Sequence, residues 1–323
     1  MVLATTAQQR QFDEEGYLVV ENVLDPERDI APVFAEFDAV LDAVAARFVA
    51  DGRIARDYHE LAFEQRFTQI SVESGEALAQ YFDISLPQKG IRSDTPFFAG
   101  AAMFRLLTHP GLLDLVEQFI GPEIWSNPVQ HIRTKLPTRA TDEKFAGHIA
   151  GAPWHQDNGV ITEEADDTDI LTVWVPFTPA TTANGCMVVM PRSQCDALAP
   201  HCPGGTGLHI PERYLPAAEP VVLPMEPGSA LLMTRRTVHS SLDNTTVDQM
   251  RLSFDLRYQP VGLPSGRPAF DGAGFVARSK AHPETELRDP AIWHRNWTNV
   301  RDTLAETEMP AFNRWSADSP VCA

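Results

Sequence analysis

One histidine of this chain precedes a carboxylate by two residues inside a run bounded by turn-forming residues. The run is Trp154-His155-Gln156-Asp157-Asn158-Gly159. Side chains alternate along an extended segment, so His155 and Asp157 are expected to point to the same face. This spacing can present one imidazole and one carboxylate to a single metal ion. A surface pair or a buried structural histidine is the alternative for the triplet alone.

A second polar segment strengthens the metal hypothesis. It contains His239 and Ser241, a turn-forming run at residues 243–246, and Arg251. Folded as a hairpin centred on Thr245, the two strands would place His239 opposite Arg251, with Ser241 on the same face. Two histidines and one carboxylate on one face of an ion suit non-haem Fe(II) oxygenases. A guanidinium nearby is well matched to a carboxylate of a chelating cosubstrate.

Other interpretations of these residues stay open at this point. Residues 251, 253, 255 and 257 form the polar side of an alternating strand, and a solvated face would have the same pattern. Three more histidines could compete as ligands, but none has a carboxylate two residues later: His109, His131 and His148.

The elements that must position these residues change in type along the chain. Apolar residues recur at helical spacing over residues 25–50 and 112–120, and the second run stops at Gly121-Pro122. After residue 122 the pattern is of short strands with tight turns, at residues 171–177, 187–190, 230–233 and 252–258. Helices followed by antiparallel strands predict an α+β chain whose second part is a sandwich or barrel.

These motifs, taken in order, resemble the phytanoyl-CoA dioxygenase family of Fe(II)- and 2-oxoglutarate-dependent oxygenases. The resemblance covers nearly the whole length and is carried by residues 12–20, 24–27, 154–157, 171–177 and 184–193. The family usually has Gly-Ser-His where this chain has Arg192-Ser193-Gln194, a departure in a turn that leaves the ligand set intact.

The resemblance implies a role for each matching residue. His155, Asp157 and His239 would bind Fe(II), and Arg251 and Ser241 would hold the distal carboxylate of 2-oxoglutarate. Three further residues fall at family positions that often line or contact the cosubstrate pocket: Trp174, Gln130 and Thr134, the last two on a strand expected at residues 129–135. For Trp174, a place in the apolar core is an equal alternative.

The implied fold is a double-stranded β-helix, also called a jelly roll, with flanking N-terminal helices. We expect a single phytanoyl-CoA dioxygenase-like domain over residues 1–323. It would comprise a mostly helical part at 1–122, a jelly-roll core at 123–262, and a C-terminal extension at 263–323 that packs on the core.

The implied reaction uses Fe(II), 2-oxoglutarate and O2 to oxidise a C–H bond of a small organic metabolite, most simply by hydroxylation, with release of succinate and CO2. Natural-product biosynthesis is one setting for such a reaction, and desaturation, epoxidation or rearrangement are variants of it. Two alternatives remain: a hydrolase or isomerase that uses Zn²⁺ or Mn²⁺ at the same triad, and a jelly-roll binding protein without catalysis.

Charge and composition restrict the partners. The 323 residues include 26 Lys plus Arg against 44 Asp plus Glu, a net charge of −18. Such a surplus argues against nucleic acid and anionic membranes as partners. The sequence also lacks a secretory signal pattern and an apolar run of membrane-spanning length, so we expect a cytoplasmic protein.

The same charge bears on the substrate. It favours a neutral or cationic metabolite over a CoA thioester, and it requires that Arg251, with help from Arg235, Arg236 or Lys135, attracts 2-oxoglutarate locally. Substrate choice is expected to depend on loops at residues 136–153, 195–220 and 261–282, with further walls from residues 90–94 and 97–98.

The cysteines show no metal-binding or disulfide pattern. Cys186, Cys195, Cys202 and Cys322 contain no Cys-x-x-Cys pair, and the chain is too long to need a disulfide scaffold. We therefore expect reduced thiols.

Overall fold

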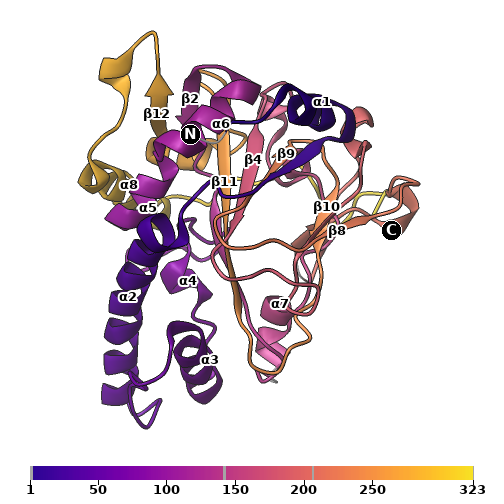
Figure 1. Cartoon of the computed structure of the whole chain (residues 1–323). Coiled ribbons are helices and arrows are strands. Elements are labelled where there is room, and N and C mark those ends of the chain that lie inside the picture. Colours follow the sequence, from indigo (N-terminus) through magenta and orange to yellow (C-terminus); the bar gives the residue numbers. More distant parts are fainter. Residues whose placement is uncertain (1–2, 141–142, 206, 323) are drawn as a thin grey trace.

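Two antiparallel sheets lie on opposite sides of a cavity in the computed structural model, which describes residues 3–140, 143–205 and 207–322 (Figure 1). The larger sheet has the order β1-β9-β4-β11-β2-β12, with β3 also paired to β11, and the smaller has the order β10-β5-β8. A further pair, β6-β7, stands apart. The strands are β1 (Tyr17–Val20), β2 (Glu123–Ser126), β3 (His131–Lys135), β4 (Leu171–Pro176), β5 (Met187–Val189), β6 (Cys202–Gly204), β7 (Gly207–His209), β8 (Val221–Leu223), β9 (Ala230–Thr234), β10 (His239–Ser241), β11 (Arg251–Pro260) and β12 (Phe275–Ser279).

Strand β11 is the centre of the larger sheet. It pairs with β4 on one side, and with β3 and then β2 on the other. Its apolar residues Leu252, Phe254, Leu256 and Tyr258 are buried in the main hydrophobic core. The predicted strands at 171–177, 187–190, 230–233 and 252–258 are all present within a residue or two. The antiparallel, sheet-rich core fits the predicted jelly roll.

The predicted hairpin between His239 and Arg251 is wrong. His239 pairs with Val189 in the smaller sheet, whereas Arg251 pairs with Lys135 in the larger one. The turn-forming residues between them hydrogen-bond to other segments: Thr245 N–H donates to the carbonyl of Ala183 at 2.8 Å. The connection therefore crosses from one sheet to the other, and the two side chains meet across the cavity instead of along a hairpin.

Helices flank the sheets. They are α1 (Thr6–Glu15), α2 (Ala31–Ala50), α3 (Phe63–Ser74), α4 (Ala79–Phe82), α5 (Ala101–Leu107), α6 (Pro110–Ile120), α7 (Ala146–Ile149) and α8 (Pro290–Glu306), with a π-helical turn η1 (Pro26–Ile30) before α2. Short 3-10 helices are η2 (Glu143–Phe145), η3 (Asp157–Val160), η4 (Glu163–Ala165), η5 (Ser193–Cys195), η6 (Glu212–Tyr214), η7 (Pro268–Ala273) and η8 (Pro283–Thr285). Both predicted helices are confirmed.

The boundaries of those two helices have local causes. The carboxylate of Asp25 accepts hydrogen bonds from the N–H groups of Glu27 and Arg28, which have no partner inside the helix. Gly121 ends α6 with φ of +85°, a conformation that side chains other than glycine rarely adopt. No helix in the described part of the chain is long and apolar enough to span a bilayer.

The helical part and the larger sheet share one core. The ring centres of Phe34 in α2 and Phe177 are 6.3 Å apart, and those of Phe177 and Phe254 in β11 are 5.9 Å apart. Behind this contact, Phe37 packs against Phe63, Phe82 and further aromatic rings of the helices. Burial of this apolar surface fixes the sheet from its outer face and leaves the opposite face free to carry polar residues.

The prediction of four reduced thiols is wrong for one pair. Cys202 and Cys322 form a disulfide, while Cys186 and Cys195 are free. The two bonded residues are 120 positions apart, so no local spacing marks them as partners. The bond ties the C-terminal segment to residues 195–220, near the smaller sheet (Figure 1).

This disulfide predicts a thiol count. Denatured protein without reductant should react with a thiol reagent at two cysteines, and after reduction at four. A Cys322→Ser variant should be less stable to denaturant by about 2–4 kcal/mol because the unfolded chain loses a long-range constraint. Four reactive thiols in protein purified without reductant would contradict the assignment.

Candidate metal centre

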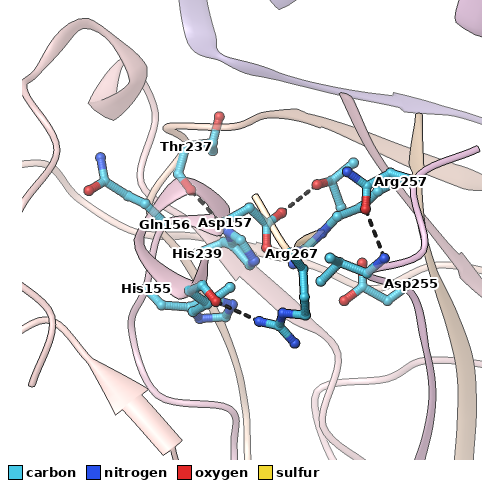
Figure 2. Close-up of polar contacts among 12 residues, drawn as sticks. His155, Gln156, Asp157, Thr237, His239, Asp255, Arg257 and Arg267 are labelled. Carbon is cyan, nitrogen blue, oxygen red and sulfur yellow. Dashed lines mark hydrogen bonds and ion pairs between the residues drawn. The ribbon is translucent and has the colours of Figure 1, made fainter. Parts of the chain in front are cut away.

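The triad predicted from the sequence is assembled. One ligand atom from each of His155, Asp157 and His239 lies within 4.8 Å of the others, and this is the one such group of three among the described residues (Figure 2). His155 and His239 exchange backbone hydrogen bonds of 3.0 Å in an isolated bridge. The extended segment ends at Gln156, since Asp157 begins η3, but both side chains still reach the same place.

Both imidazoles are oriented by backbone carbonyls. Nδ1 of His155 lies 2.8 Å from the carbonyl oxygen of Pro153, and Nδ1 of His239 lies 2.9 Å from that of Thr237. Because a carbonyl can only accept, each Nδ1 carries a proton, which leaves Nε2 as the ring atom that can bind a metal. Burial, and then the nearby His239, lower the pKa of His155. The neutral, ligand-competent form of His155 is therefore the resting one.

Asp157 is buried and compensated. Its side chain and that of Arg257 are each 3% exposed and form an ion pair, and the hydroxyl of Thr172 donates to its other oxygen. Burial alone would raise the pKa of Asp157, but Arg257 and the two imidazoles outweigh it and hold that pKa well below its usual range. The carboxylate is thus ionised and held in place before any ligand arrives.

The loop that carries His155 and Asp157, here called the triad loop, is held by segments that are distant in sequence. The backbone N–H of Gln156 donates to Nε2 of the buried His201 at 2.9 Å, and the indole of Trp315 donates to the carbonyl of Gly159 at 2.6 Å. A Cβ on Gly159 would lie 2.0 Å from the His201 ring, so only glycine fits there. The 195–220 segment and the C-terminal segment, joined by the disulfide, thereby fix the loop that carries His155 and Asp157.

A second polar group lines the same cavity as His155 and His239. Arg251 donates from Nη1 to the hydroxyl of Ser253 at 2.9 Å, and its guanidinium is 5.4 Å from the ring centre of Trp174. Its Nε has no partner, and no described acidic residue pairs with it. Burial lowers the pKa of Arg251 to about 10, so the group remains a cation at neutral pH.

Lys135 lies next to Arg251 on the paired strand. Its ammonium donates to the hydroxyl of Ser241 at 2.9 Å. Burial, followed by repulsion from Arg251, lowers the pKa of Lys135 to about 7. The hydroxyl of Thr134 is buried and has no hydrogen-bond partner. Unpaired buried donors of this kind are normally satisfied by a ligand or water.

The cavity shows which predicted residues come together. Its volume is about 490 Å³, and the predicted residues that line it are Thr134, His155, Trp174, His239, Ser241 and Arg251. Gln130 does not line it, because its amide turns away to Ser126 and the carbonyl of Asn127. Neither Arg235, which pairs with Asp169, nor Arg236 lines it. The polar side of β11 is therefore a buried cavity wall and not a solvated face.

The predicted loops contribute unequally. Residues 147–148 and 150–153, Gly207 with Leu208, and Arg267 line the cavity from the three predicted loops. Residues 141–142 and 206 lie outside the described part. Residues 90–94 and 97–98 contribute nothing to the wall. Phe98 instead packs on Phe37 in the helical core, and residues of α4 and Gln88 take the expected place.

Two arginines of the cavity wall were not predicted as site residues from the sequence. Arg257 lies six residues after Arg251 on the same face of β11, so the alternation of the strand could have identified it. Arg267 follows β11 in an irregular loop, and no periodic pattern indicates that it is buried. Its burial depends on tertiary packing alone.

Comparison with known proteins finds one matching family model and several relatives. Residues 12–253 match the family model described as phytanoyl-CoA dioxygenase (PhyH). The chain is 27% identical over 267 residues to a 1-deoxypentalenic acid 11-beta-hydroxylase of Streptomyces arenae, covering 80% of this chain and 82% of that protein. It is 26% identical over 250 residues to the peroxisomal phytanoyl-CoA dioxygenase of Homo sapiens, covering 75% and 64%.

Solved structures share the fold. A non-heme monooxygenase, ThoJ in its apo form, has a TM-score of 0.57 at 18% identity, over 91% of this chain and 95% of that one. The epimerase SnoN in complex with Fe3+, alpha ketoglutarate and nogalamycin RO has a TM-score of 0.51 at 21% identity, over 80% and 86%.

The buried ion pair predicts how an Arg257→Met variant behaves. Without metal, Asp157 would lose its counter-charge, and we expect a loss of about 3–5 kcal/mol of unfolding free energy. Mn²⁺, a redox-stable probe, should restore more stability in the variant than in the wild type, because the ion replaces the missing cation. Thermal unfolding with and without Mn²⁺ measures both effects.

Asp157→Asn is the matched control, since it removes the buried charge and should abolish the Mn²⁺ effect. The deficit of Arg257→Met relative to the wild type should shrink from pH 7 to pH 5. In the wild type the lowered pKa keeps Asp157 ionised over this range, whereas in the variant Asp157 can take up a proton. Metal-free Arg257→Met as stable as the wild type would contradict the role given to this pair.

Proposed function

The chain belongs to the phytanoyl-CoA dioxygenase family, and from this premise we propose that it hydroxylates a C–H bond of a small organic metabolite, with release of succinate and CO2. It is an oxidoreductase of the class that uses Fe(II), 2-oxoglutarate and O2. One observation supports the proposal above all: ligand atoms of two imidazoles and an ionised carboxylate lie within 4.8 Å of one another, and both imidazoles line a cavity with a buried guanidinium that has no acidic partner among the described residues.

The donor set fits an iron ion. Nε2 of His155, Nε2 of His239 and an oxygen of Asp157 would bind Fe(II) on one face and leave the other face for cosubstrate and O2. When bound, iron and 2-oxoglutarate together supply the oxidation of a C–H bond by O2. The chain's own part is to orient the two imidazoles through the carbonyls of Pro153 and Thr237, and to keep the carboxylate ionised through Arg257.

The neighbouring polar group fits 2-oxoglutarate. Arg251 would hold the distal carboxylate, with Ser241 and Lys135 as further donors and Trp174 and Thr134 as walls. Gln130 is not part of the proposal, because its amide is already hydrogen-bonded outside the cavity. The Streptomyces relative is named for hydroxylation of 1-deoxypentalenic acid, which supports hydroxylation and a natural product as the substrate.

Anaerobic reconstitution tests the proposal. Fe(II) followed by 2-oxoglutarate should produce the weak visible charge-transfer band of the chelate, and Arg251→Ala should lower the affinity for 2-oxoglutarate about 10- to 100-fold through loss of a charged hydrogen bond. A screen of metabolites for succinate release above the uncoupled rate would then identify substrates. Turnover under argon would instead indicate a hydrolase or isomerase, and a protein that binds neither Fe(II) nor 2-oxoglutarate would be a binding protein.

Lys135 predicts a pH dependence of 2-oxoglutarate binding. Its lowered pKa of about 7 reflects burial and Arg251, only partly offset by Asp243 and Cys186. Below pH 7 Lys135 is a cation that attracts the dianion, and above pH 7 it loses this charge, so the Kd should rise between pH 6 and 8.5. Calorimetry on Mn²⁺-loaded protein measures the effect, which should be absent in Lys135→Met. An equal slope in both proteins would assign the dependence to another group.

A further inference from the structure

We propose that Arg267 binds a carboxylate of the substrate, so that the proposed oxygenase acts on a small organic acid. This inference rests on the proposed function and adds the class of its substrate. Arg267 immediately precedes η7, is 2% exposed and lines the same cavity as His155 and His239. Figure 2 shows its side chain extending beside the triad.

The guanidinium of Arg267 lacks a counter-charge. Its Nη2 donates to the carbonyls of Val160 at 2.7 Å and Phe312 at 3.4 Å, and its Nε is buried without a partner. These carbonyls are dipoles and carry no net charge, and no described acidic residue forms an ion pair with Arg267. A buried cation without a counter-ion is costly, and burial lowers the pKa of Arg267 to about 9.

Most other charges of the cavity wall have a partner in the chain or a place in the proposed cosubstrate site. Arg257 is paired with Asp157, and the acidic side chains of the wall are engaged elsewhere, Asp83 with His131 at 2.9 Å and Asp255 with Arg133 at 4.0 Å. Arg251 and Lys135, at the cosubstrate side, are assigned to 2-oxoglutarate. Arg267 is therefore the buried cation of the described wall that neither the chain nor the cosubstrate would neutralise.

Apolar residues of the wall suit the body of such an acid. Val129, Val160 and Leu208 line the cavity together with Arg267, and a volume of about 490 Å³ admits a small molecule. The two phenylalanine rings near the guanidinium, Phe270 at 5.7 Å and Phe312 at 5.2 Å, keep it in position. This assignment differs from the neutral or cationic substrate expected from the net charge of the chain.

A matched set of ligands tests the inference. The probes are 1-adamantanecarboxylate and a series of cycloalkane and terpenoid carboxylates, each paired with its primary amide, which has the same shape without the charge. Calorimetry on protein loaded with Mn²⁺ and 2-oxoglutarate should give at least one acid that binds about tenfold or more tightly than its amide. Arg267→Met should abolish this preference, and Arg267→Lys should retain part of it.

Two controls separate the site from general charge effects. Arg288→Met removes an exposed arginine, with a side chain 73% exposed, and should leave the acid preference unchanged. Arg133→Met removes a half-exposed cation of the cavity wall. It measures how much of the preference for the acid comes from the general positive charge of the wall. The inference is wrong if no acid binds more tightly than its amide to the wild type, or if Arg267→Met keeps the preference.

Binding of 2-oxoglutarate is measured first in each protein. If the wild type does not bind 2-oxoglutarate, the proposed function is wrong. The acid-to-amide ratio of affinities, measured without cosubstrate, would still decide the role of Arg267. If Arg267→Met fails to fold, the acid-to-amide ratio of the wild type and of Arg267→Lys provides the decision. A purely structural role for Arg267 would lower the melting temperature of the variants without changing that ratio.

Discussion

The ion pair between Asp157 and Arg257 is the contact on which the site depends. It joins the loop that carries His155 and Asp157 to the central strand of the larger sheet, with both side chains almost fully buried. Opposite charges attract strongly where water is excluded, but each alone would be expensive to bury. The pair therefore allows an ionised carboxylate to stand inside the fold. The backbone bridge between His155 and His239 makes the corresponding connection to the smaller sheet.

The rest of the chain supports these two connections from outside. The apolar face of β11 and the aromatic residues of the helical part form one core, so the larger sheet is held from behind. On the other side, His201 and Trp315 hold the triad loop through single hydrogen bonds to its backbone. A site with such support keeps its geometry before ligands bind, which is what chemistry at a metal requires.

Charge is distributed unevenly between the surface and the cavity. The chain carries −18 overall, yet the described cavity wall contains Arg133, Lys135, Arg251, Arg257 and Arg267 against Asp83 and Asp255. Surface charges are screened by salt over about 8–10 Å, whereas charges in a water-poor cavity act at short range with little screening. An acidic protein can therefore bind an acidic cosubstrate, and by the same reasoning an acidic substrate.

The sequence by itself determined the features that depend on local periodicity and spacing. The helices at 25–50 and 112–120, the main strands and the pairing of His155 with Asp157 could be predicted because helical and extended backbones repeat at fixed intervals. The ordered motifs also identified the family. How residues 1–323 divide into parts and which roles the assembled residues perform remain predictions.

Only the tertiary structure decided the contacts between distant segments. Four features have no local signature: the crossing of residues 242–250 between two sheets, the Cys202–Cys322 bond, the turn of the Gln130 amide away from the cavity, and the burial of Arg267. Each depends on how elements far apart in the chain pack together. Packing is set by the shape and charge of the whole assembly, which no short stretch of residues contains.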